Sequence, residues 1–98
     1  MAAEALDRFT KGKSVEDFKA DEVLQAAVER KLGIIGEAFV HLREADGATA
    51  DLFSDLRQIV GMRNRLVHGY DQLDVDVLWD TVVNHVPSLL HQVETMLD

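Results

Sequence analysis

Apolar residues recur every three or four positions through most of this chain, which is the spacing of one buried helix face. The longest such segment covers about 20–44, and a second covers 49–69. A third, over 75–96, contains Pro87, whose missing N–H and bulky ring predict a kink in the helix or its division in two. No segment alternates apolar and polar residues at the period of a strand. The pattern predicts an all-α protein, an up-down bundle of four to five helices joined by short turns.

Local signals mark where some of these helices begin. A short helix is expected over 2–9, and after a turn Ser14 and Asp17 have the spacing of a capping box. Thr49 is expected to cap the helix that covers 49–69, because a threonine hydroxyl can accept a hydrogen bond from an unpaired backbone N–H.

Two glycines, Gly33 and Gly36, interrupt the longest helical segment. Each costs up to about 1 kcal/mol relative to alanine in a helix interior. A close approach of another helix would explain such residues, and we expect it at both positions.

Length and composition describe one small domain over residues 1–98. A chain of this size buries only about 60–65% of its unfolded surface, so pairing of two copies would supplement its core. The absence of cysteine excludes disulfides and thiolate metal sites. The N-terminal residues do not resemble a signal peptide, and no apolar run approaches the roughly 20 residues of a membrane span, so the expected compartment is the cytoplasm.

Charge is distributed unevenly along the chain. The net charge of −8 argues against a polyanionic ligand. Residues 56–70, however, contain no acid and hold Arg57, Arg63, Arg65 and His68, which makes a local basic patch. On charge alone, an ordinary solvated helix face is the simpler interpretation.

The decapeptide 61–70, Gly-Met-Arg-Asn-Arg-Leu-Val-His-Gly-Tyr, concentrates the candidate chemistry. On a helix, Asn64 and His68 lie one turn apart on the same face. Arg63 and His68 are five residues apart, an offset of about 140° on a straight helix, so they do not converge. Unwinding at Gly69 or a second copy of the helix across a two-fold axis would bring them together. We favour the second solution and expect a homodimer.

The pattern Arg-Asn-x-x-x-His-x-Tyr over 63–70 resembles the signature of HEPN-domain ribonucleases. It is most similar to the HepT branch, the toxins of toxin–antitoxin systems that are paired with minimal nucleotidyltransferase antitoxins. The stretch 30–38, Arg-Lys-Leu-Gly-Ile-Ile-Gly-Glu-Ala, resembles the long helix that precedes the motif in that family, and the resemblance covers about 14–98. The chain departs from the family in its shorter N-terminal helix and in Gly33, where the family tends to carry a larger helix former.

The resemblance implies metal-independent cleavage of RNA, without a cofactor, by attack of the 2′-hydroxyl on the adjacent phosphate. In that scheme His68 moves the proton, Arg63 holds the phosphate, and Asn64 orients His68 or hydrogen-bonds the phosphate. DNA lacks the internal nucleophile and is not an expected substrate. The resemblance also implies that Tyr70 accepts AMP from the antitoxin, and the added bulk and negative charge would silence the site.

The remaining polar residues of interest have plainer expected roles. Arg65 is either a second phosphate contact or a salt-bridge former, and Glu37 is expected to form a hydrogen bond near the motif helix. Glu37 and His41 lie four residues apart, but two ligands make a poor metal site, so no metal is expected. Trp79 is expected in the core or in a dimer interface, and His85 is assigned no function.

Two other functions are compatible with these residues. The chain could be a non-catalytic HEPN module that binds and supports a nucleotidyltransferase partner, or a purely structural helical dimer. The intact set of Arg63, His68 and Tyr70 favours the ribonuclease.

Overall fold

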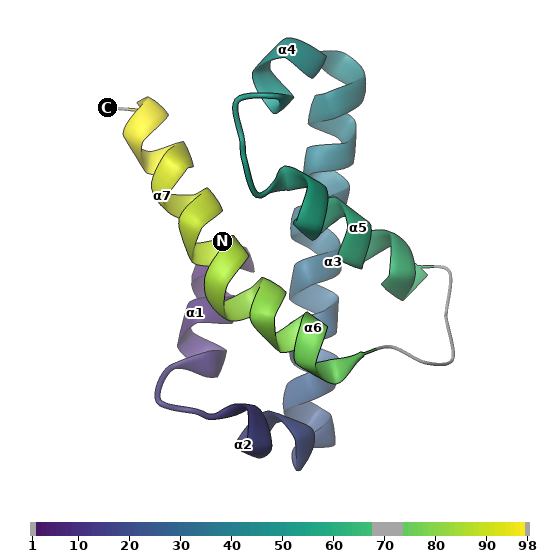
Figure 1. The fold of residues 1–98 in the computed structure, drawn as a ribbon, viewed down its shortest axis with the longest axis vertical. Helices are drawn as coiled ribbons and strands as arrows, with labels where there is room; N and C mark the ends of the chain where they lie inside the picture. Colours follow the sequence, from purple (N-terminus) through teal and green to yellow (C-terminus); the bar gives the residue numbers. More distant parts are fainter. Residues whose placement is uncertain (1, 68–73, 98) are drawn as a thin grey trace.

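A computed structural model of the chain describes residues 2–67 and 74–97, and every regular element in those two ranges is a helix (Figure 1). The all-α prediction is therefore confirmed for the described part of the chain. In order, the elements are α1 (Ala2–Thr10), α2 (Val15–Lys19), α3 (Glu22–Ala45), α4 (Gly47–Ala50), α5 (Leu56–Val67), α6 (Val75–Asp80), the π-helical segment η1 (Thr81–His85) and α7 (Val86–Leu97).

The long helix α3 is the centre of the fold. It packs against α1, α2, α4 and α5, while α6, η1 and α7 form one continuous rod that crosses in front of it (Figure 1). The core between these helices is apolar, and each large side chain buried there contributes about 1.5–3 kcal/mol. Its fully enclosed members come from α1, α2, α3, α5 and the rod: Leu6, Phe18, Val28, Leu32, Ile59, Leu78, Val82 and Val86. No helix in the described ranges has both the length and the apolar character needed to cross a membrane.

The capping box predicted at the start of α2 is confirmed. The Ser14 hydroxyl accepts a hydrogen bond from the Asp17 N–H at 3.2 Å, and the Asp17 carboxylate accepts one from the Ser14 N–H at 2.9 Å. The cap fixes the direction in which α2 presents Phe18, which is fully buried and lies 5.1 Å from the Trp79 ring, measured between centroids. Trp79 therefore packs against the core, which is one of the two positions predicted for it.

The predicted start at Thr49 of the helix over 49–69 is wrong, because α5 begins at Leu56. Asp46 caps the short helix α4, because its carboxylate accepts hydrogen bonds from both the backbone N–H and the hydroxyl of Thr49. These two bonds lower the pKa of Asp46. The chain then turns through 51–55 before α5 begins, and the turn buries Phe53 against Phe39 with ring centroids 5.4 Å apart.

The sequence predicts a kink or a division at Pro87; the structure has a wide helical turn just before the proline, and the helix is not divided. In a regular helix the backbone carbonyl of Val83 would accept a hydrogen bond from the N–H of residue 87. Pro87 has no N–H, and its ring crowds that carbonyl. In η1 the Val86 N–H instead bonds to the Thr81 carbonyl, five residues back. One extra residue in the turn keeps the rod continuous across the proline.

Helices α3 and α5 approach each other closely at Gly36. A Cβ built there would lie 2.7 Å from the Arg63 Cγ and 3.4 Å from the Ile59 carbonyl oxygen, so nothing larger than glycine fits without a shift. At Gly33 a Cβ would have no neighbour within 4 Å among the described residues. The prediction of close packing is confirmed at Gly36 and wrong at Gly33.

Candidate active site

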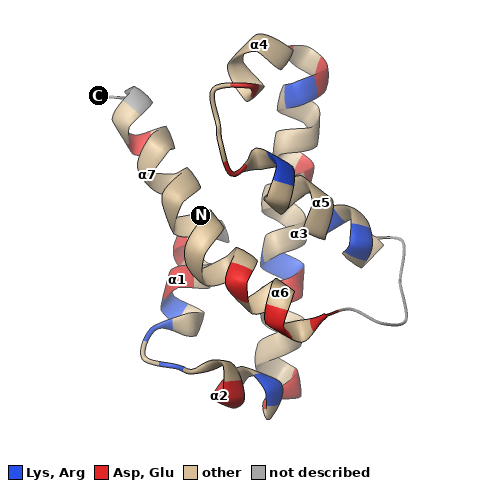
Figure 2. Ribbon diagram, in the orientation of Figure 1, with Lys and Arg blue, Asp and Glu red and all other residues tan. Residues whose placement is uncertain are grey.

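Helix α5 carries the described part of the motif and separates its residues onto two faces. Its inner face buries Leu56, Ile59, Val60 and Met62 against the core. Its outer face exposes Arg57, Gln58, Gly61 and Arg65. Figure 2 shows basic positions near both ends of α5 and no acidic position along it, so this helix presents a locally positive surface on an acidic protein.

Arg63 lies between these two faces and is partly buried. Its Nη1 donates a hydrogen bond to the Asn64 Oδ1 at 3.0 Å. Its Nε is buried and has no hydrogen-bond partner among the described residues. The first two carbons of its side chain lie against Gly36 of α3. Arg63 is therefore held by packing along its stem and by Asn64 at its tip.

Asn64 uses its carbonyl oxygen to accept the bond from Arg63, which fixes the orientation of its amide. An asparagine amide also carries two N–H donors. Arg63 and Asn64 together present a cluster of N–H donors with no acid on the same helix. Such a cluster is suited to binding a phosphate.

The other predicted site residues divide into those that the structure places and those that it does not. His68 and Tyr70 lie outside the described residues. Arg65 is exposed, which is compatible with either of its expected roles. Glu37 is 59% exposed and pairs with His41 of the same helix, Oε1 to Nε2 at 3.8 Å. Its supporting role near the motif stays a prediction.

No group of three or more histidine, cysteine or acidic residues that could hold a metal ion occurs in the described ranges. The Glu37–His41 pair therefore gains no third ligand from the part of the chain that is described.

A pair that the sequence did not reveal connects the start of α5 to the rod. The Asp55 Oδ1 lies 2.7 Å from the His85 Nδ1, and the two side chains are 13% and 27% exposed. Burial would raise the pKa of Asp55, but hydrogen bonds from Ser88 and His85 outweigh it and lower that pKa. Thirty residues separate the partners, so no local spacing could have predicted the contact.

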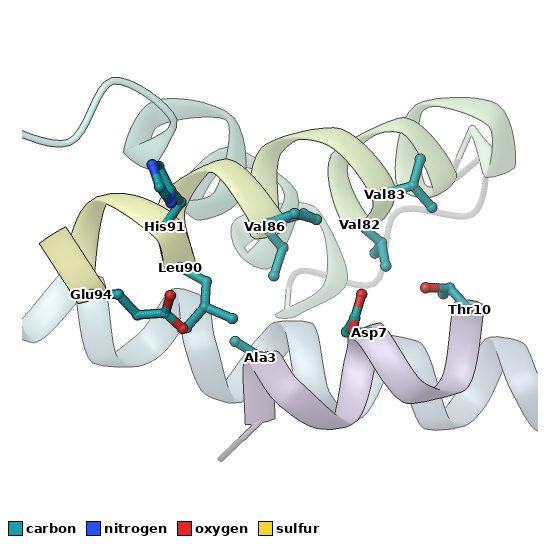
Figure 3. Close-up of a pocket in the computed structure, with 10 residues that line it drawn as sticks. Ala3, Asp7, Thr10, Val82, Val83, Val86, Leu90, His91 and Glu94 are labelled. Atoms are coloured by element: carbon teal, nitrogen blue, oxygen red, sulfur yellow. The ribbon is translucent and has the colours of Figure 1, made fainter.

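A hollow of 370 Å³ lies between α1 and the rod (Figure 3). Its floor is apolar, with Val82, Val86 and Leu90, and the acids Asp7 and Glu94 lie along it. None of its lining residues belongs to the motif. Its acids would repel a phosphate, so this hollow does not compete with α5 as a site for RNA.

Fold and site together define the class of protein: a domain that is all-helical over its described residues and carries arginine and asparagine donors on one acid-free helix. The chain belongs to the ribonuclease HepT-like family, whose model matches residues 1–96. This confirms the resemblance that the motif at 63–70 and the stretch 30–38 indicated.

Similar proteins agree with the family assignment. The chain is 38% identical over 95 residues to "Probable ribonuclease HepT" of Thermococcus cleftensis, covering 97% of this chain and 86% of that protein. It is 37% identical over 91 residues to a protein of Caldanaerobacter subterraneus that is also named as an RNase, covering 89% and 77%. A similarly named protein of Methanocaldococcus jannaschii is 30% identical over 94 residues, covering 91% and 73%. No solved structure gave a significant match.

Proposed function

We propose that this protein is a metal-independent endoribonuclease and the toxin of a toxin–antitoxin system. The observation that carries the proposal is the Arg63–Asn64 donor pair on the acid-free helix α5 of a HepT-like chain. In the proposed reaction the 2′-oxygen of a ribose attacks the adjacent phosphorus and the bond to the 5′-oxygen breaks. The products are a 2′,3′-cyclic phosphate and a free 5′-hydroxyl.

Each motif residue has a role in this reaction. His68 accepts the proton of the 2′-hydroxyl or delivers one to the leaving 5′-oxygen, since imidazole titrates near neutral pH. Arg63 binds the phosphate and stabilises the charge that develops in the transition state. The amide N–H groups of Asn64 add hydrogen bonds to the same phosphate or to His68.

The exposed face of α5 extends this site along the RNA. Arg57 and Arg65 are eight residues apart, about 12 Å along a helix, and both are exposed. Gly61 lies between them and is exposed, and a Cβ there would have no described neighbour within 4 Å. This face therefore offers two cations and room for a backbone, and we assign to it the phosphates that flank the cleaved bond.

A second copy of the chain completes the proposed site. Helix α5 is regular up to Val67, so an angle of about 140° separates Arg63 from His68 if the helix continues one more residue. A homodimer with a two-fold axis beside α5 would set Arg63 of one protomer against His68 of the other.

The proposed antitoxin is a nucleotidyltransferase that modifies Tyr70. The phenol oxygen of Tyr70 attacks the α-phosphorus of ATP, forms a phosphodiester with AMP and releases pyrophosphate. The modified side chain carries bulk and negative charge into a site built for RNA phosphate, and it repels the substrate.

The experiment that tests this function incubates purified protein with single-stranded RNA and with DNA of the same sequence, in EDTA. We expect cleavage of the RNA alone, with cyclic phosphate ends. His68→Ala and Arg63→Ala should each lower the rate by about 10²–10⁴-fold. Arg43→Ala, an exposed arginine of α3 outside the motif, is the matched control. Intact RNA with folded, unmodified wild-type protein would contradict the proposal and favour a non-catalytic module that supports a nucleotidyltransferase.

Growth assays test the regulatory part separately. Expression of the wild type should arrest growth, and co-expression of the antitoxin should relieve it. Tyr70→Phe should remain toxic but lose the rescue. Rescue of Tyr70→Phe would show that the antitoxin acts without modifying Tyr70.

A further inference from the structure

Gly36 leaves a space on α3 that the side chain of Arg63 fills. A Cβ at position 36 would meet the Cβ and Cγ of Arg63, the latter at 2.7 Å. Glycine in a helix interior costs about 1 kcal/mol relative to alanine. The chain bears that cost at a position where an added Cβ would clash with a predicted catalytic residue. At Gly33, one turn earlier, a Cβ would meet no described residue within 4 Å.

The burial of the aliphatic part of Arg63, its stem, decides which edge of the guanidinium can reach a ligand. A guanidinium can bind a phosphate with two parallel N–H bonds, either from Nε and Nη2 or from Nη1 and Nη2. The Nε of Arg63 is buried and unpaired among the described residues, whereas Nη1 reaches the Asn64 oxygen. Burial thus removes the Nε edge and leaves Nη2 and the second N–H of Nη1 for a phosphate.

We propose that Gly36 is a positioning residue for Arg63. The missing side chain lets the Arg63 stem lie against α3, which withholds Nε from the substrate and aims the Nη1 and Nη2 pair at the phosphate. The role in cleavage rests on the proposed ribonuclease function. The position of Arg63 does not, so the two can be tested apart.

Activity measurements compare Gly36→Ala with Gly33→Ala. A misplacement of about 1 Å can cost 10²-fold in rate, so we expect Gly36→Ala to lower kcat by about 10–100-fold and to change KM less than threefold. Gly33→Ala adds the same methyl group to the same helix at a position with no described neighbour within 4 Å, and its kcat should stay within twofold of the wild type. Equal kcat values for the two variants would overturn the proposal.

Hydrogen exchange of arginine Nε–H groups, followed by NMR, reports the position of Arg63 without reference to activity. In the wild type the Arg63 Nε–H should exchange at least tenfold more slowly than that of Arg65, which is exposed on the same helix. Gly36→Ala should abolish the difference, and Gly33→Ala should retain it. A Gly36→Ala protein with low kcat but a protected Arg63 Nε–H would overturn the positioning role, since the loss would then have another structural cause.

If Gly36→Ala does not fold, measurements on the wild type test the contact between Gly36 and Arg63. Contact between the two residues predicts a nuclear Overhauser effect between the Gly36 Hα and Arg63 Hγ protons. Its absence, or exchange of the Arg63 Nε–H as fast as that of Arg65, would overturn the proposal. If wild-type protein shows the contact and the protection but cleaves no RNA, the proposed function fails while the placement of Arg63 by Gly36 stands.

Discussion

Replacing Arg63 by methionine should inactivate the protein and stabilise its fold at the same time. Methionine keeps the Cβ and Cγ that lie against Gly36. It then places sulfur and a methyl group where arginine has Cδ and Nε. The substitution therefore preserves the buried stem and removes the guanidinium, including the Nε donor that is buried without a partner among the described residues.

The magnitude follows from two opposing terms. A buried donor without a partner costs about 1–3 kcal/mol, so its removal stabilises the folded state by that amount. The lost hydrogen bond to Asn64 costs about 0.5–1.5 kcal/mol, because Asn64 is only partly buried and water can replace the donor. Methionine and arginine have similar helix propensities. The net gain is about 1 kcal/mol, which raises Tm by roughly 4–8 °C for a domain of this size.

Thermal and urea unfolding at one fixed protein concentration measure this change, because association would make Tm depend on concentration. Arg65→Met is the control: its side chain is exposed, and its effect should stay within about 0.5 kcal/mol. RNA cleavage by Arg63→Met should fall by about 10²–10³-fold. A loss of more than about 1 kcal/mol in the free energy of unfolding would refute the reasoning, since it would mean that the Arg63 Nε has a partner in the folded protein.

Three further changes test other parts of the structure. Asp55→Asn should lower the free energy of unfolding by about 1–3 kcal/mol at neutral pH. Folding lowers the Asp55 pKa from its ordinary value of 3.8, so the ionised carboxylate stabilises the fold above that pH and loses this effect as the pH falls below it. Urea unfolding should therefore show the difference in stability between wild type and Asp55→Asn shrinking below pH 3.8. Phe18→Ala should cost about 3–5 kcal/mol in thermal unfolding, because Phe18 is fully buried beside Trp79. Arg57→Ala should weaken binding of single-stranded RNA and reduce the slope of log K against log salt by about 0.7, and an unchanged slope would exclude a phosphate contact at Arg57.

The sequence by itself determined the features that depend on neighbours three or four residues apart. The helical period, the capping box at Ser14 and an irregularity near Pro87 all depend on such local contacts. The motif at 63–70 was also readable, because its residues are contiguous in the sequence and match a family pattern. The homodimer, the antitoxin and the roles of His68 and Tyr70 stay predictions.

The tertiary structure decided what depends on contacts between distant segments. The sequence could not show that Gly36 is closely packed and Gly33 is not, because this depends on where α5 lies against α3. Of the two, only Gly36 contacts Arg63. It missed the Asp55–His85 pair for the same reason, since 30 residues separate the partners. The start of α5 was misplaced because an aromatic contact, Phe53 against Phe39, holds a turn where the apolar spacing alone allows a helix. Local spacing fixes which face of a helix is apolar, but only the packed neighbour fixes where that helix begins and which side chain it can hold in place.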